Sequence, residues 1–151
     1  MFLRFFLVFL FTVPPLILSA QTEKNLISKG ADLYFNEQYQ EAYELLLPYA
    51  DKGNADAEYY IGAIYFWGKS IKKDQKTGWA YLEKSAQQGN MYAEFSLGIA
   101  YAFGDYVSED MDKALKWLCR AKAQGHPDVL ETFANISLDN PRKGELSCPE
   151  K

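Results

Sequence analysis

The sequence predicts an all-α fold, an α-solenoid of helix–loop–helix repeats, from two observations. Residues 55–90 and 91–126 align without a gap over a period of 36 residues. A fixed period in the range of about 20–50 residues is typical of arrays of small helical or strand units. Within each unit, apolar residues recur at helical spacing and glycine follows each expected helix. Such arrays have no single central core and offer an extended binding surface.

The N-terminus, residues 1–20, predicts a secretory signal peptide. Arg4 precedes the largely apolar stretch 5–18, and small residues up to Ala20 form a cleavage point. A retained membrane anchor is the alternative, but the apolar run is shorter than the roughly 20 residues of a spanning helix and contains two prolines. We therefore expect cleavage after Ala20, a periplasmic or secreted protein, and no membrane contact afterwards.

The remaining chain is expected to be one solenoid over residues 21–140, followed by a polar tail, 141–151. Its expected parts are a short repeat 26–54, full repeats 55–90 and 91–126, and a half-repeat cap 127–139. The short repeat replaces the long loop of the full units with a tight turn. The half-repeat supplies a single helix with a polar exterior, which a solenoid needs at its end.

Glycine and aspartate punctuate each full unit. In the first, Gly68 suits the left-handed end of the first helix, Asp74 is placed to cap the second, and Gly89 ends it. Gly62 lies inside the first helix, where glycine costs about 1 kcal/mol relative to alanine. Because Gly98 repeats it, we expect the two helices of each unit to approach closely there.

Composition and motifs argue against catalysis. The chain is mildly acidic, with a formal net charge of −4 and no basic stripe, which disfavours nucleic acid as a partner. The only histidine, His126, has no nucleophile or orienting acid near it in sequence, so we interpret it as a polar residue after a helix rather than a catalytic base. Without metal-ligand spacing or a phosphate-binding loop, we expect no enzyme, no metal and no cofactor.

The two cysteines, Cys119 and Cys148, predict a disulfide. In an oxidising compartment an even count favours a bridge, and two cysteines allow one pairing. Two free thiols in a reducing compartment are the alternative, which the signal peptide disfavours. Cys119 stands at the repeat position of Glu83, expected to face solvent, so the bridge would tie the polar tail over the last full repeat.

The repeated pattern resembles the Sel-one-like repeat, a subclass of tetratricopeptide-like helical repeats. The residues that carry the resemblance are Ala57, Ile61, Gly62, Tyr65, Gly68 and Gly89, with Ala93, Leu97, Gly98, Tyr101, Gly104 and Gly125. The resemblance implies a right-handed α/α superhelix that binds proteins, often secreted or periplasmic in bacteria. Two residues depart from the pattern, since Gly78 replaces the usual alanine and Lys122 replaces a small residue.

In such repeats the first helices line the concave face, and aromatic residues there are candidates for partner binding. Phe35, Trp67 and Phe103 each precede a glycine or asparagine that ends a helix, and Tyr60 adds a fourth ring. One interpretation is an aromatic ladder that binds another protein or peptide, because Trp and Tyr are common binding hot spots. The other is that these rings only fill the space between repeats.

The resemblance leaves three classes of function. The first is a non-catalytic interaction scaffold or adaptor in the cell envelope. The second is a periplasmic immunity protein that masks an envelope-targeted toxin. The third is a β-lactam or cell-wall hydrolase, since some cysteine-rich relatives have been associated with β-lactams. Those relatives resemble scaffolds with a cysteine pair in each repeat, which this chain lacks, so the scaffold is the preferred expectation.

Overall fold

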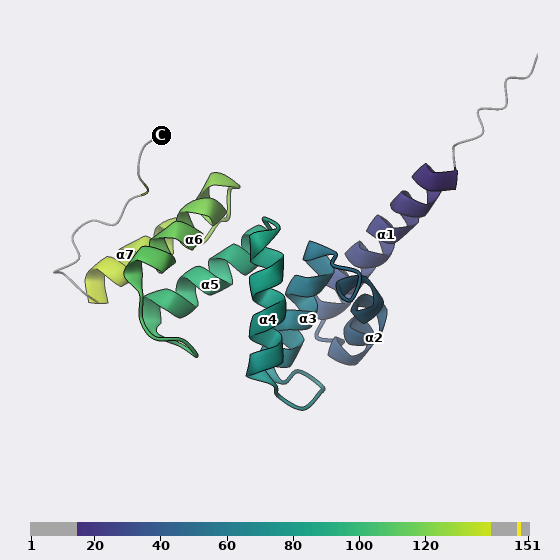
Figure 1. The fold of residues 1–151 in the computed structure, drawn as a ribbon, viewed down its shortest axis with the longest axis horizontal. Coiled ribbons are helices and arrows are strands. Elements are labelled where there is room, and N and C mark those ends of the chain that lie inside the picture. Colours follow the sequence, from purple (N-terminus) through teal and green to yellow (C-terminus); the bar gives the residue numbers. More distant parts are fainter. Residues whose placement is uncertain (1–14, 140–147, 149–151) are drawn as a thin grey trace, which may run out of the picture.

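The computed structural model describes residues 15–139 and residue 148, and within them the chain forms seven helices (Figure 1). The helices are α1 (Pro15–Phe35), α2 (Tyr39–Ala50), α3 (Ala55–Trp67), α4 (Gln75–Gln87), α5 (Met91–Phe103), α6 (Met111–Ala123) and α7 (Val129–Asp139). Residues 1–14 of the expected signal peptide lie outside the described part, whereas 15–20 belong to α1. The expected tail, 141–151, also lies outside it, apart from Cys148.

The helices pack as successive pairs, α1 with α2, α3 with α4, and α5 with α6, and α7 closes the array. Figure 1 shows the pairs following one another along an elongated molecule in chain order. We call α1, α3, α5 and α7 the first helices and α2, α4 and α6 the second helices. Among the first helices, α1 contacts α3 and α5 contacts α7. The predicted all-α array of helix pairs is confirmed.

Side-chain caps fix where the helices begin. Asn54 and Asn90 each accept two backbone N–H groups at the start of α3 and α5. Asp74 accepts the N–H of Thr77 at 3.1 Å at the start of α4, and Asp110 caps α6 in the same way. These caps satisfy N–H groups that have no partner inside the helix. The expected role of the two aspartates is confirmed.

Glycines bring the helices of each pair together. A Cβ added at Gly62 would lie 3.0 Å from the carbonyl oxygen of Gly78, and one at Gly98 would lie 2.6 Å from Cγ of Leu118. One at Gly78 would lie 2.5 Å from the backbone nitrogen of Phe66. The close approach expected from the repeated glycine is therefore present in both full repeats.

The apolar core of the described residues is divided into three clusters that follow chain order. The first is shared by α1, α2 and α3, the second by α3, α4 and α5, and the third by α5, α6 and α7. Each cluster thus spans one junction between neighbouring repeats. This is the packing of a solenoid, in which a repeat contacts only its neighbours.

Candidate protein-interaction site

Three of the four aromatic residues proposed from the sequence lie exposed at the same repeat position. Phe35, Trp67 and Phe103 are the last residues of α1, α3 and α5, and their exposed fractions are 66%, 56% and 49%. Gly68 and Gly104 follow directly in left-handed conformations, which end the helix and leave the preceding ring uncovered. The backbone plan of the repeat therefore places a large ring at the end of α1, α3 and α5.

The fourth residue, Tyr60, lies differently. Its exposed fraction is 7%, and its ring packs against Tyr34 at 5.2 Å, Tyr59 at 5.0 Å and Phe35 at 6.1 Å between ring centroids. Burial raises the pKa of its hydroxyl to about 12. Tyr60 thus fills the junction between α1 and α3 and supports Phe35 from behind. For Tyr60, the structure therefore favours the second interpretation, in which the ring fills the space between repeats.

Next to Trp67 lies an apolar pocket of about 220 Å³ between α3 and α5. Six aromatic rings contribute to its wall, from Tyr34, Tyr59, Phe66, Trp67, Trp79 and Phe95. Most of the lining residues come from first helices, and Ser96 and Asp105 add polar atoms. Phe103 and Phe35 do not line it, so Trp67 alone links the exposed rings to the pocket.

Sequence analysis missed most of this pocket. Tyr59 and Phe95 occupy one repeat position, as do Ala63 and Ile99, so the pocket is built from two copies of the same helix face. A repeated aromatic at the position before Tyr60 was the available sequence signal. Tyr34 was harder to find because it belongs to the shortened first repeat, where the register is interrupted.

Charge is distributed unequally between the first and second helices of the full repeats. Between their bounds α3 and α5 contain no Lys or Arg, and their ionisable acids are Asp56, Glu58 and Glu94. The second helices α4 and α6 carry the basic residues Lys76, Lys84, Lys113, Lys116, Arg120 and Lys122. The surface of the first helices, which we call the first-helix face, therefore carries no basic side chain from α3 or α5, and Asp56 is the one exposed acid of these two helices.

Two of these acids are buried and serve the packing of the repeats. Glu58 accepts a hydrogen bond from Nε2 of Gln88 at 2.6 Å, and Glu94 accepts one from Gln124 at 2.8 Å. Glu94 also forms an ion pair of 2.7 Å with Arg120. Burial is the main cause that raises the pKa of both carboxyls. Each acid joins the start of a first helix to the end of the next second helix.

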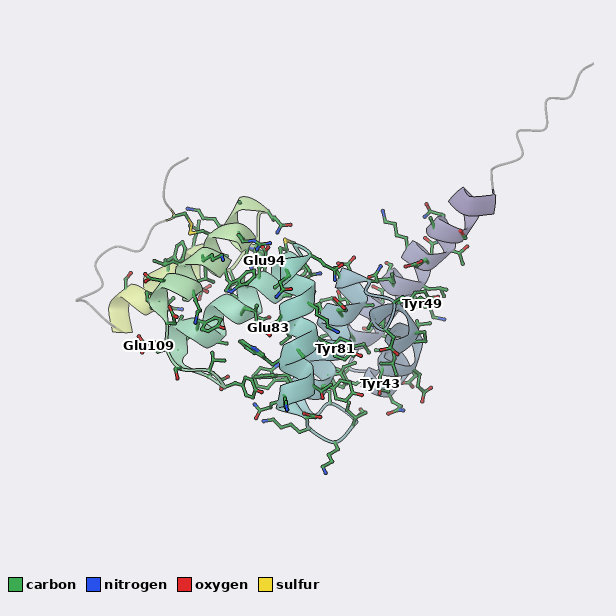
Figure 2. All side chains as sticks on the ribbon, in the orientation of Figure 1. Tyr43, Tyr49, Tyr81, Glu83, Glu94 and Glu109 are labelled. Carbon is green, nitrogen blue, oxygen red and sulfur yellow. A yellow bond between two sulfur atoms is a disulfide. The ribbon has the colours of Figure 1, made fainter. Side chains whose placement is uncertain are left out.

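A tyrosine cluster joins α2, α3 and α4. The hydroxyls of Tyr43 and Tyr65 lie 2.8 Å apart, and that of Tyr81 donates to Asp51 at 2.8 Å (Figure 2). The rings of Tyr65 and Tyr81 stack with centroids 6.2 Å apart. The hydrogen bond to Tyr43 is the main cause that raises the pKa of Tyr65 to about 12. Tyr81 has its pKa raised to about 12 as well, mainly by burial, so at neutral pH the phenols of Tyr65 and Tyr81 stay protonated and act as hydrogen-bonding side chains between repeats.

His126 lies buried against aromatic rings. Its ring stacks on Phe95 with centroids 4.0 Å apart and meets Tyr92 edge-on at 5.4 Å. Its Nδ1 accepts the backbone N–H of Asp128 at 3.3 Å. Burial lowers the pKa of the imidazole. His126 is therefore a neutral packing residue that supports a wall of the pocket.

Cys119 and Cys148 form a disulfide with a Cα–Cα distance of 5.5 Å, as predicted. Both residues pack against the cluster shared by α5, α6 and α7. Lys122, which departs from the small residue expected at its position, is exposed and places its Nζ 6.0 Å from the ring of Phe133. The C-terminal end thus differs from the central repeats.

Within residues 15–139 and 148, no group of three His, Cys, Asp or Glu side chains is arranged to hold a metal ion. The described helices also contain no segment with the length and hydropathy that crossing a membrane requires.

Comparison with known proteins identifies the repeat. The Sel1 repeat family matches residues 55–90 and 92–126. No curated protein sequence matches the chain significantly. Sel1 repeats are usually non-catalytic and are typical of protein-interaction scaffolds, and the match identified no catalytic family.

The solved structures that are similar to the chain include two bacterial repeat proteins. One is a Sel1 repeat protein from Oxalobacter formigenes, at 27% identity and a TM-score of 0.66, covering 76% of this chain and 45% of that one. The other is c5321, a protective antigen of uropathogenic Escherichia coli with the same repeat fold, at 23% identity and a TM-score of 0.68, covering 81% of this chain and 28% of that one. The chain thus spans less than half of each. It is a Sel1-like repeat protein, built of tetratricopeptide-like helical repeats.

Proposed function

We propose that this protein binds a segment of another protein on its first-helix face, without catalysis, as a scaffold or adaptor of the cell envelope. The pocket beside Trp67 is the observation that carries the proposal. It combines an exposed Trp with a preformed apolar cavity of about 220 Å³. Tryptophan in such a pocket is a frequent source of binding energy at protein interfaces.

The exposed rings of Phe35 and Phe103 extend the proposed contact along the array. They stand at the repeat position of Trp67 on the neighbouring first helices. An extended segment that crosses α1, α3 and α5 would meet one ring per repeat. Repeat proteins use the surface of successive units in this way, because their repeated geometry offers repeated contacts.

An envelope location is supported by the disulfide and by the N-terminal sequence. Disulfides persist in oxidising compartments, which include the periplasm. Residues 1–20 have the charge, apolar stretch and small cleavage-site residues of a signal peptide. N-terminal sequencing of the protein from bacterial envelope fractions tests this part, with Gln21 as the expected first residue.

The absence of catalysis is proposed because the buried acids and the histidine are used in packing. Glu58 and Glu94 are bound by amide side chains, and His126 is enclosed by rings. Incubation of the purified protein with nitrocefin is expected to give no hydrolysis. Turnover above a buffer control would instead favour a β-lactam hydrolase.

Affinity capture from envelope extracts tests the binding site itself. The wild type, Trp67→Ala and Leu130→Ala serve as baits, because Leu130 is similarly exposed (64%) but does not line the pocket. We expect a partner captured by the wild type and Leu130→Ala to be lost with Trp67→Ala, while circular dichroism shows all three folded. Equal capture by folded Trp67→Ala would contradict the proposed site.

A further inference from the structure

The pocket beside Trp67 has the size of a site for one side chain. Its volume of about 220 Å³ lies below the roughly 300–1,000 Å³ of typical small-molecule sites. Its wall is largely aromatic, with Tyr59, Trp67 and Phe95 among the rings. Aromatic faces carry negative electrostatic potential and attract cations that lie over them within about 6 Å.

Asp105 is the one charged residue among the described residues that line this pocket. It directly follows Gly104, lies exposed, and forms no ion pair with another described residue. Its carboxylate is therefore available to a cation that enters from the partner. Because α3 and α5 contain no Lys or Arg between their bounds, neither helix supplies a competing positive charge.

The same repeat position carries the opposite charge one unit earlier. Lys69 stands 36 residues before Asp105, and its Nζ lies 5.0 Å from the ring centre of Tyr39. At that junction the protein thus places its own cation over an aromatic ring. At the next junction, the aromatic residues that line the pocket are accompanied by the carboxylate of Asp105 and, among the described residues, by no lysine or arginine. The pocket therefore has the charge that would bind a positively charged side chain of a partner.

We propose that the pocket between α3 and α5 accepts the side chain of an arginine in the bound segment, with its guanidinium against Trp67 and facing Asp105. This inference rests on the proposed function. Arginine fits better than lysine, because the planar guanidinium stacks on rings, pairs with carboxylates through two N–H groups, and is less strongly hydrated than an ammonium. The partner is accordingly a protein with an exposed arginine in an extended segment.

The test uses the indole N–H signals of the protein's three tryptophans in a two-dimensional nuclear magnetic resonance spectrum. Trp67 and Trp79 line the pocket, whereas Trp117 lies on α6 and serves as an internal reference. The probes are acetyl-arginine amide and acetyl-citrulline amide, which have nearly the same shape but differ in charge. We expect saturable shifts of Trp67 and Trp79 with the arginine probe, and much smaller shifts with citrulline.

Two variants locate the charge. Asp105→Asn is expected to weaken binding of the arginine probe about threefold to fivefold, as for loss of an ion pair with an exposed carboxylate. Asp112→Asn is the matched control, because Asp112 is an exposed carboxyl on a second helix. Equal response to arginine and citrulline, equal shifts of Trp117, or unchanged binding by Asp105→Asn would each overturn the inference.

A random peptide library selected on the full-length protein separates this inference from the proposed function. Enriched peptides that contain arginine, and that lose binding in both Trp67→Ala and Asp105→Asn, support both. Enriched peptides without arginine that still depend on Trp67 overturn the arginine inference and retain the binding site. Enriched peptides whose binding is independent of Trp67 overturn both.

Discussion

The two full repeats follow one backbone plan but hold their helices together differently. In the first, Gly62 faces Gly78, so α3 and α4 touch backbone to backbone. In the second, Ala114 stands at the position of Gly78, and Gly98 faces the side chain of Leu118. The first pair therefore depends on the absence of side chains, and the second on their packing.

The buried acids of the two full repeats also differ in their contacts. Glu58 and Glu94 occupy one repeat position and each accepts a glutamine side chain. Only Glu94 has an ion pair, with Arg120, which also donates to the carbonyl oxygen of Ala86 at 3.2 Å. The comparison teaches that equal helices can be joined by steric fit in one repeat and by charge in the next. Mutations in each repeat test this difference.

Loss of the disulfide is expected to have the largest effect, and to act at the C-terminal end, because Cys119 lies on α6 and packs against the cluster shared by α5, α6 and α7. Cys119 and Cys148 close a loop with a sequence separation of 29, for which loop entropy predicts about 3.6 kcal/mol. We expect Cys119→Ser with Cys148→Ser to lower the free energy of unfolding by about this amount. Hydrogen exchange measures where the loss falls, and amides of α6 and α7 are expected to lose protection before those of α3 and α4.

Gly78→Ala is expected to cost about 2 kcal/mol, because the new Cβ meets backbone atoms of Phe66 and Gly62 that cannot move aside. The reverse change in the second repeat, Ala114→Gly, is expected to cost about 1 kcal/mol through lower helix propensity. Urea unfolding of both variants measures the difference. A stabilised Gly78→Ala variant would show that the backbone contact in the first repeat is not tight.

Arg120→Ala is expected to cost about 1–2 kcal/mol, because it leaves the fully buried Glu94 without its cation, discounted for the half-exposed side chain of Arg120. Lys84→Ala, the equivalent change in the first repeat, is expected to cost less than about 0.5 kcal/mol. Urea unfolding at neutral pH compares them. Equal losses would mean that the ion pair contributes nothing specific.

Protonation of Glu94 makes the free energy of unfolding depend on pH. The pKa of Glu94 is raised above 4.5 by burial and lowered again by Arg120. Between the unfolded pKa of about 4.5 and the higher folded pKa, the folded protein binds more protons than the unfolded chain. The contribution of Glu94 to the free energy of unfolding is therefore greatest below about pH 4.5 and decreases as the pH rises through the folded pKa. We expect Arg120→Ala to extend this decrease to higher pH and Glu94→Gln to remove it, with the exposed Glu41→Gln as control.

Ser85→Ala is expected to lower the free energy of unfolding by about 1 kcal/mol, because Oγ of Ser85 donates to the carbonyl oxygen of Ala55 at 2.7 Å. Ala121 occupies the equivalent position in the second repeat, so the second repeat shows that the helix pair packs without this bond. Thermal unfolding measures the loss. No change in the melting temperature would assign the hydroxyl no role.

Much of the fold could be predicted because the same sequence pattern occurs in both full repeats. Asp74 and Asp110 cap helices at equivalent positions, and Gly62 and Gly98 mark the same close approach, so each pattern was supported by its copy. The disulfide followed from there being only two cysteines. The exposure of Phe35, Trp67 and Phe103 follows from the glycine or turn that ends each first helix.

The pocket could not be predicted in the same way, because it depends on the angle between successive pairs. Periodicity places Tyr59 and Phe95 on equivalent helix faces but does not say how far apart those faces lie. Tyr60 illustrates the limit. Its helical position suggested a surface ring, yet the shortened first repeat brings α1 close enough to bury it.

The division of the core into three clusters has a consequence for how the chain folds. Each cluster joins only three consecutive helices, so its contacts connect residues close together in the sequence. Chains of low contact order pay little loop-closure entropy before their contacts form, and they fold quickly. Each junction can therefore assemble independently of the distant end, and a nascent chain can complete the α1–α3 cluster while the last repeat is still being synthesised.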